Sequence, residues 1–78
     1  MSERDARLID LLCAVFGVTP EDIRPDKGRG TLKGWDSLRH LKLIMAIEEE
    51  FGIELTQEEI ESIATVADIK QALTVHGI

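Results

Sequence analysis

The sequence predicts an all-α fold, and three observations support this prediction. Apolar residues recur at helical spacing in several segments, and no segment shows the strict alternation of a half-buried strand. Residues that favour helix N-caps, Ser, Asp or Thr, precede these segments. The 78 residues include only 4% aromatic side chains, a composition that suits a small bundle packed with aliphatic residues. We therefore expect a single domain over residues 1–78: a four-helix bundle with a long loop between helices I and II and a short helix III.

The first helix is predicted over residues 3–16. Ser2 and Asp5 have the spacing of a capping box, with aspartate in place of glutamate, and Gly17 ends the helix. The stripe expected to face the core consists of Ile9, Leu12, Cys13 and Phe16. Cys13, the only cysteine, is interpreted as a small buried hydrophobe, and a lone cysteine excludes an internal disulfide.

The connection over residues 17–34 contains both prolines and four of the six glycines. Thr19 and Pro20 predict a short helical start, because proline is favoured at the first helical position. Such a long loop in a small domain either spans antiparallel helices or carries function. Its glycines suggest a mobile approach to the second helix.

The second helix is predicted from Ser37 to Phe51. Asp36 is a good N-cap, and Gly52 fits the left-handed position that ends many helices. Its apolar residues cover more than one face, as expected for a central helix that contacts several others. They are Leu38, Leu41, Leu43, Ile44, Met45, Ile47 and Phe51.

Two shorter helices complete the bundle. Thr56 and Glu59 form a capping-box sequence, which predicts a third helix to about Ser62. Thr65 begins the fourth helix. Its inward positions are predicted to be Val66, Ile69, Ala72 and Leu73.

The net charge of −6 is unevenly distributed. Residues 1–39 hold seven basic and seven acidic side chains, whereas residues 40–78 hold two basic and eight acidic ones. This balance makes nucleic acid an unsuitable partner and favours partner proteins with basic patches, although an acidic face also serves solubility. The carboxylates between Glu48 and Glu61 lack the spacing of a calcium loop, so no metal site is expected. Without a signal peptide or a long apolar run, we expect a cytoplasmic protein with no membrane insertion.

Ser37 is the candidate attachment point for a phosphate-linked group. It falls in the first turn of the second helix, where unpaired N–H groups and the positive end of the helix dipole stabilise a phosphate. The simpler interpretation is an unmodified serine beside an ordinary cap. A catalytic set of Asp36, Ser37 and His40 is disfavoured, because Asp36 is better used as the cap and no oxyanion hole is evident. His40 is expected to be an exposed surface histidine.

Four stretches carry a resemblance to a known family. They are Asp36-Ser37-Leu38, the apolar pattern over residues 41–47, Glu48-Glu49-Glu50-Phe51-Gly52-Ile53 and Thr65-Val66-Ala67-Asp68-Ile69. Together they make the chain resemble an acyl carrier protein from Asp5 to Leu73. The resemblance implies 4′-phosphopantetheine on Ser37, with Asp36 and Leu38 as the recognition motif. It further implies a monomeric, non-catalytic carrier, modified by a phosphopantetheinyl transferase and served by a loading ligase or transferase and pathway synthases.

The chain departs from the fatty-acid carriers of this family in charge. Arg39 and Lys42 stand where those carriers place acidic residues. The resemblance therefore favours a discrete carrier of a specialised fatty-acid, polyketide or similar pathway. An aminoacyl or peptidyl carrier of the same fold is an alternative, as is an unmodified acidic helical interaction module. The expected partner-binding residues are Arg39, Lys42, Met45, Glu48 and Glu49.

Overall fold

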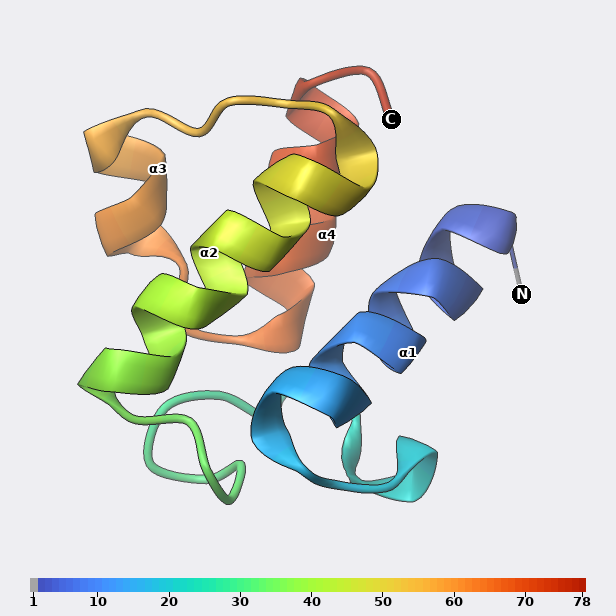
Figure 1. The fold of residues 1–78 in the computed structure, drawn as a ribbon, viewed down its shortest axis with the longest axis vertical. Coiled ribbons are helices and arrows are strands. Elements are labelled where there is room, and N and C mark those ends of the chain that lie inside the picture. Colours follow the sequence, from blue (N-terminus) through green and yellow to red (C-terminus); the bar gives the residue numbers. More distant parts are fainter. Residues whose placement is uncertain (1) are drawn as a thin grey trace.

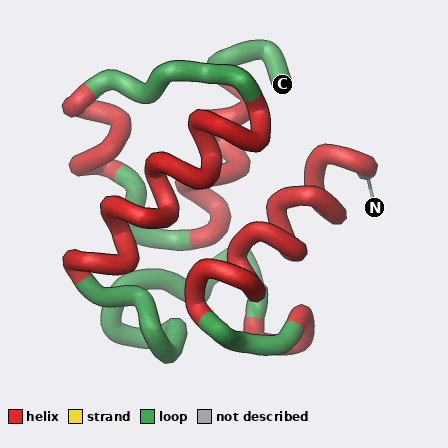
Figure 2. The backbone as a smooth tube through the Cα atoms, in the orientation of Figure 1, coloured by secondary structure: helices red, strands yellow, loops and turns green. Residues whose placement is uncertain are grey.

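The computed structural model describes residues 2–78, and within this range it contains four α-helices and no strand (Figure 1). The elements in chain order are α1 (Glu3–Phe16), the 3-10 helix η1 (Pro20–Asp22), α2 (Ser37–Phe51), α3 (Gln57–Ser62) and α4 (Val66–Val75). The predicted helical bundle with a short third helix is confirmed. The long loop between α1 and α2 crosses the lower end of the bundle in Figure 2.

The helix ends follow the local signals in the sequence. The Asp36 carboxylate accepts a hydrogen bond from the Arg39 N–H and begins α2, and Gly52, at φ +64°, ends it. Reciprocal capping boxes open α3 and α4 at Thr56 and Thr65. At α1 the Ser2 hydroxyl accepts from the Asp5 N–H. These bonds satisfy N–H groups that the first turn of a helix cannot pair internally.

The buried stripe of α1 differs from the predicted one. Leu8, Leu12 and Phe16 are buried, whereas Ile9 and Cys13 are only partly buried. Two overlapping stripes are available on this helix, and the one that faces the core is flanked by Leu11 and Val15, which pack against it. Burial raises the pKa of the Cys13 thiol, and the charge of Asp10 adds to the shift. The neutral thiol is therefore favoured.

The apolar residues of α2 divide into a buried face and an exposed row. Leu43, Ile44, Ile47 and Phe51 belong to the core together with residues of the other helices. Leu38, Leu41 and Met45 are 65%, 59% and 68% exposed, and we call them the apolar row. These three residues do not belong to the core, because α1, α3 and α4 leave this face of α2 uncovered.

The long loop is tied to the link between α3 and α4. Gly28 forms an isolated β-bridge with Thr65, and the Arg29 N–H donates to the Ala64 carbonyl oxygen at 3.0 Å. Gly28 is buried, and a Cβ there would collide with the Ala64 carbonyl oxygen. Backbone pairing therefore ties the loop to this link at Gly28 and Arg29, and the mobility of its approach to α2 stays a prediction. Only glycine fits at position 28, because the backbone of Ala64 approaches it closely.

In the described part of the chain, no helix combines the length and the apolar character that a membrane span requires.

Candidate functional site

Ser37 is the first residue of α2 and is exposed at the end of the helix that adjoins the long loop (Figure 1). Asp36 occupies two N–H groups of the first turn. Its Oδ1 accepts from the Arg39 N–H at 2.8 Å, and its carbonyl oxygen accepts from the His40 N–H at 2.8 Å. Within residues 2–78 the Ser37 hydroxyl forms no hydrogen bond, so it is available to a reacting partner.

His40 lies on the inner side of the same turn and is only 6% exposed. The expectation of a surface histidine is therefore wrong. The Trp35 Nε1–H donates to His40 Nδ1 at 3.1 Å, and His40 Nε2 lies 3.0 Å from the Ile60 carbonyl oxygen. Because Trp35 can only donate, Nδ1 accepts, and Nε2 carries the proton given to Ile60. Through its two ring nitrogens, His40 connects the start of α2 to α3.

An aromatic stack lies under the loop–helix junction. The rings of Phe16 and Trp35 stack with centroids 5.1 Å apart, and Trp35 stacks on His40 at 6.2 Å. Trp35 is buried and packs over this junction. The stack joins the end of α1, the loop and the start of α2, so the backbone before Ser37 rests on an aromatic base. A tryptophan just before the cap was the sequence signal for this base.

The five residues predicted to bind partners lie along α2 but differ in their surroundings. Lys42, Met45 and Glu49 are exposed. Arg39 is partly buried, and its Nη1 donates to the Phe16 carbonyl oxygen at 3.1 Å. Glu48 is partly buried, and its Oε2 accepts from the Leu55 N–H at 2.9 Å. The two partly buried side chains thus have structural partners within the chain, which composition and spacing did not reveal.

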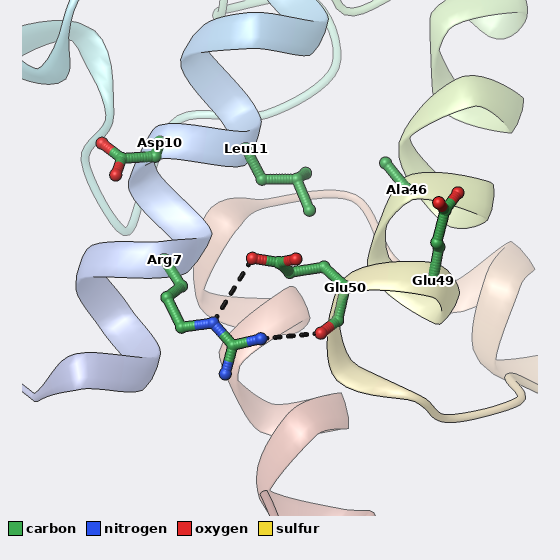
Figure 3. Close-up of a pocket in the computed structure, with 6 residues that line it drawn as sticks. All are labelled: Arg7, Asp10, Leu11, Ala46, Glu49 and Glu50. Atoms are coloured by element: carbon green, nitrogen blue, oxygen red, sulfur yellow. Dashed lines mark hydrogen bonds and ion pairs between the residues drawn. The ribbon is translucent and has the colours of Figure 1, made fainter.

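An open groove of about 390 Å³ lies between α1 and the C-terminal half of α2 (Figure 3). The Arg7 guanidinium spans it, donating to the Glu50 carboxylate at 3.3 Å and to the Glu50 carbonyl oxygen at 2.7 Å. The same guanidinium stacks over the Phe51 ring at 5.1 Å. This groove is lined by four charged side chains together with Leu11 and Ala46, and it does not include Ser37.

These features describe a small all-helical domain that displays an exposed serine at the start of a helix. A family model described as "Phosphopantetheine attachment site" matches residues 6–73, which is 68 of the 78 residues (73 − 6 + 1). The chain belongs to this family, and its resemblance to acyl carrier proteins is confirmed. It is a phosphopantetheine-carrying protein, a role that involves a phosphopantetheinyl transferase and synthases. Carrier domains of this family are generally non-catalytic.

The surroundings of Ser37 fit a covalently attached phosphodiester. The hydroxyl is exposed, and the next residue, Leu38, is exposed as well, so nothing within residues 2–78 covers the position. The start of α2 supplies the positive end of a helix dipole. The negative charge of Asp36 is directed to the Arg39 N–H, which offsets its repulsion of a phosphate.

Proposed function

We propose that Ser37 carries the 4′-phosphopantetheine arm and, through it, an acyl or related thioester. The observation that supports this most directly is the exposed hydroxyl at the capped first turn of α2. The arm supplies a terminal thiol, on which the cargo is held as a thioester. The protein itself displays the arm and performs no bond chemistry on the cargo.

The attachment reaction uses coenzyme A and a separate transferase. The Ser37 oxygen forms a new O–P bond to the phosphate that bears the pantetheine chain. The phosphoanhydride bond of coenzyme A breaks, the adenosine bisphosphate leaves with its electron pair, and the serine proton passes to a base of the transferase. Asp36 keeps the first turn of α2 formed during this step, and Leu38 offers an apolar contact beside it.

The decisive experiment is coexpression with a broad-specificity phosphopantetheinyl transferase, followed by intact-mass measurement. We expect wild type to gain one phosphopantetheinyl group and Ser37→Ala to gain none. A wild-type mass that does not change, or a gain that persists in Ser37→Ala, contradicts the proposal. The first outcome would favour the unmodified interaction module.

The role of the Asp36 charge is tested by Asp36→Asn. Asparagine caps helices about as well as aspartate, so we expect the free energy of unfolding to change by less than about 0.5 kcal/mol. If the transferase reads the carboxylate, the modification rate falls several-fold all the same. Modification at the wild-type rate would show that Asp36 acts only as a cap.

We further propose that the partner enzymes belong to a specialised fatty-acid, polyketide or similar pathway and dock on the outer face of α2. The apolar row begins beside Ser37, and Lys42 falls between its members Leu41 and Met45. Glu49 follows near the C-terminal end of α2. A partner built for acidic residues near the arm would meet the positive charge of Lys42, which disfavours that pairing. The native partner therefore presents an acidic or neutral patch there.

Lys42→Glu tests this partner choice. Changing Arg39 to aspartate as well would confuse the result, because Arg39 also bonds the Phe16 carbonyl oxygen. We expect holo Lys42→Glu to be loaded several-fold better than wild type by generic fatty-acid enzymes, with the gain largest at low salt. Equal loading of wild type and variant would contradict the proposed specialisation.

A further inference from the structure

Arg39 links α2 to α1 at the end of the bundle that bears Ser37. Its Nη1 donates to the carbonyl oxygen of Phe16, the last residue of α1, at 3.1 Å. Carbonyl groups in the last turn of a helix have no partner within the helix. A guanidinium there supplies a donor and also interacts favourably with the negative end of the helix dipole.

Gly34 holds the loop against this contact. Its φ is +89°, and a Cβ there would lie 2.8 Å from the Phe16 carbonyl oxygen and 2.9 Å from Arg39 Nη1. The loop backbone therefore passes directly beside the hydrogen bond, where only glycine leaves enough space. Two residues later, the Asp36 N–H donates to the Gly34 carbonyl oxygen at 3.1 Å.

The backbone of Arg39 completes this closed unit, because its N–H donates to the Asp36 carboxylate. The side chain of Arg39 thus bonds the end of α1 beside Gly34, Gly34 bonds Asp36, and Asp36 bonds the backbone of Arg39. Ser37 lies inside this sequence of contacts.

We propose that Arg39 is a positioning residue for the attachment serine, rather than a residue that chiefly contacts partner enzymes. This inference rests on the proposed function of Ser37. By fixing the loop and the first turn of α2 to the end of α1, Arg39 holds the backbone that bears the Ser37 hydroxyl in one position. A transferase gains rate from a nucleophile that is held in place before the reaction.

The test compares Arg39→Gln with Lys42→Gln in transferase kinetics on the apo protein. Both variants remove one positive charge from the same helix. Arg39→Gln also breaks the bond to Phe16, whereas the Lys42 side chain forms no hydrogen bond within residues 2–78. We expect kcat for Arg39→Gln to fall roughly tenfold with KM within about twofold of wild type, the pattern of a lost transition-state interaction. Arg39→Lys should recover part of the rate because it keeps a charged donor.

A raised KM with unchanged kcat in Arg39→Gln would overturn the proposal, because this is the pattern of lost partner binding. An equal fall of kcat in Arg39→Gln and Lys42→Gln would overturn it too, because a residue on the docking face such as Lys42 is expected to act on KM and not on kcat. If Arg39→Gln fails to fold, the kcat of Arg39→Lys decides in its place: a value below that of Lys42→Gln supports positioning, and an equal one refutes it.

Amide hydrogen exchange provides a readout that does not depend on modification. The amides of Arg39 and His40 bond Asp36, and we expect them to exchange at least about threefold faster in Arg39→Gln. The Gly52 amide, at the other end of α2, should keep its wild-type rate. If wild type is not modified at all, the proposed function fails, and the exchange rates still decide whether Arg39 holds the first turn. Unchanged exchange at Arg39 and His40 refutes that role.

Discussion

The two ends of the α1–α2 pair are joined by the same kind of hydrogen bond, but the surroundings of the two bonds differ. At each end, an arginine of one helix donates to a last-turn carbonyl oxygen of the other. Arg39 of α2 donates to Phe16 at 3.1 Å, and Arg7 of α1 donates to Glu50 at 2.7 Å. The helices run antiparallel (Figure 1), so each arginine meets the negative end of its partner's dipole.

The surroundings of the two arginines differ. Arg7 also pairs with the Glu50 carboxylate, and both side chains are 44% exposed. Arg39 has no carboxylate partner among residues 2–78, is partly buried and lies against the backbone of Gly34. The far end is therefore held by exposed charges, and the serine end by backbone contacts and close packing. This difference predicts that the serine end tolerates much less change in shape.

The largest effect is expected for Gly34→Ala. A Cβ at Gly34 would meet the Phe16 carbonyl oxygen at 2.8 Å, and the positive φ adds strain. We expect the free energy of unfolding to fall by more than about 2 kcal/mol, measured by urea unfolding. Gly30→Ala is the matched control, because Gly30 has φ +88° but no atom within 4 Å of its Cβ position. A similar loss in both variants would show that backbone strain alone matters and not the close contact.

A smaller loss is expected for Trp35→Phe. Phenylalanine keeps a ring in the stack, but it removes the donor to His40 Nδ1 and leaves that buried atom unpaired. An unpaired buried acceptor costs about 1–3 kcal/mol. Because Trp35 is the only tryptophan, unfolding should be followed by circular dichroism. A variant as stable as wild type would mean that the bond between Trp35 and His40 contributes nothing to the serine end.

Arg7→Gln is expected to cost about 1 kcal/mol, since exposed ion pairs and cation–π contacts contribute little. It should leave the modification kinetics of Ser37 unchanged, unlike Arg39→Gln. Urea unfolding and the transferase assay measure the two effects separately. If Arg7→Gln slows modification as much as Arg39→Gln does, the two ends are equivalent and the comparison is wrong.

The smallest effect is expected at low pH, for Glu59 in α3, which lies at neither end of the α1–α2 pair. The backbone N–H of Thr56 donates to the Glu59 carboxylate and lowers its pKa, and a hydrogen bond from His76 acts in the same direction. Because the pKa is lower in the folded state, the ionised carboxylate stabilises the fold above about pH 5, and this contribution is lost as the pH falls. We expect the difference in Tm between wild type and Glu59→Gln to shrink from pH 6 to pH 3. A constant difference would contradict the lowered pKa.

Much of the fold followed from local signals. The ends of α2 at Ser37 and Phe51 were predicted correctly because the capping bond of Asp36 spans three residues and Gly52 adopts a conformation that suits glycine. The same holds for Thr56 and Thr65, whose capping boxes need only residues up to three positions away. The family was evident too, because the attachment motif, the apolar pattern of the second helix and the two later stretches are all sequence segments that can be compared without the tertiary structure.

Only the tertiary structure decided those interior positions and contacts that local patterns left open or placed wrongly. Periodicity offered two stripes on α1, and only packing against the other helices selected the one with Leu8. His40 is buried because Trp35 and Ile60 supply partners for both ring nitrogens, and Ile60 is twenty residues away. Arg39 bonds a carbonyl group twenty-three residues away. Capping depends on backbone geometry within a turn, which neighbouring residues determine, whereas these contacts exist only after distant segments have packed together.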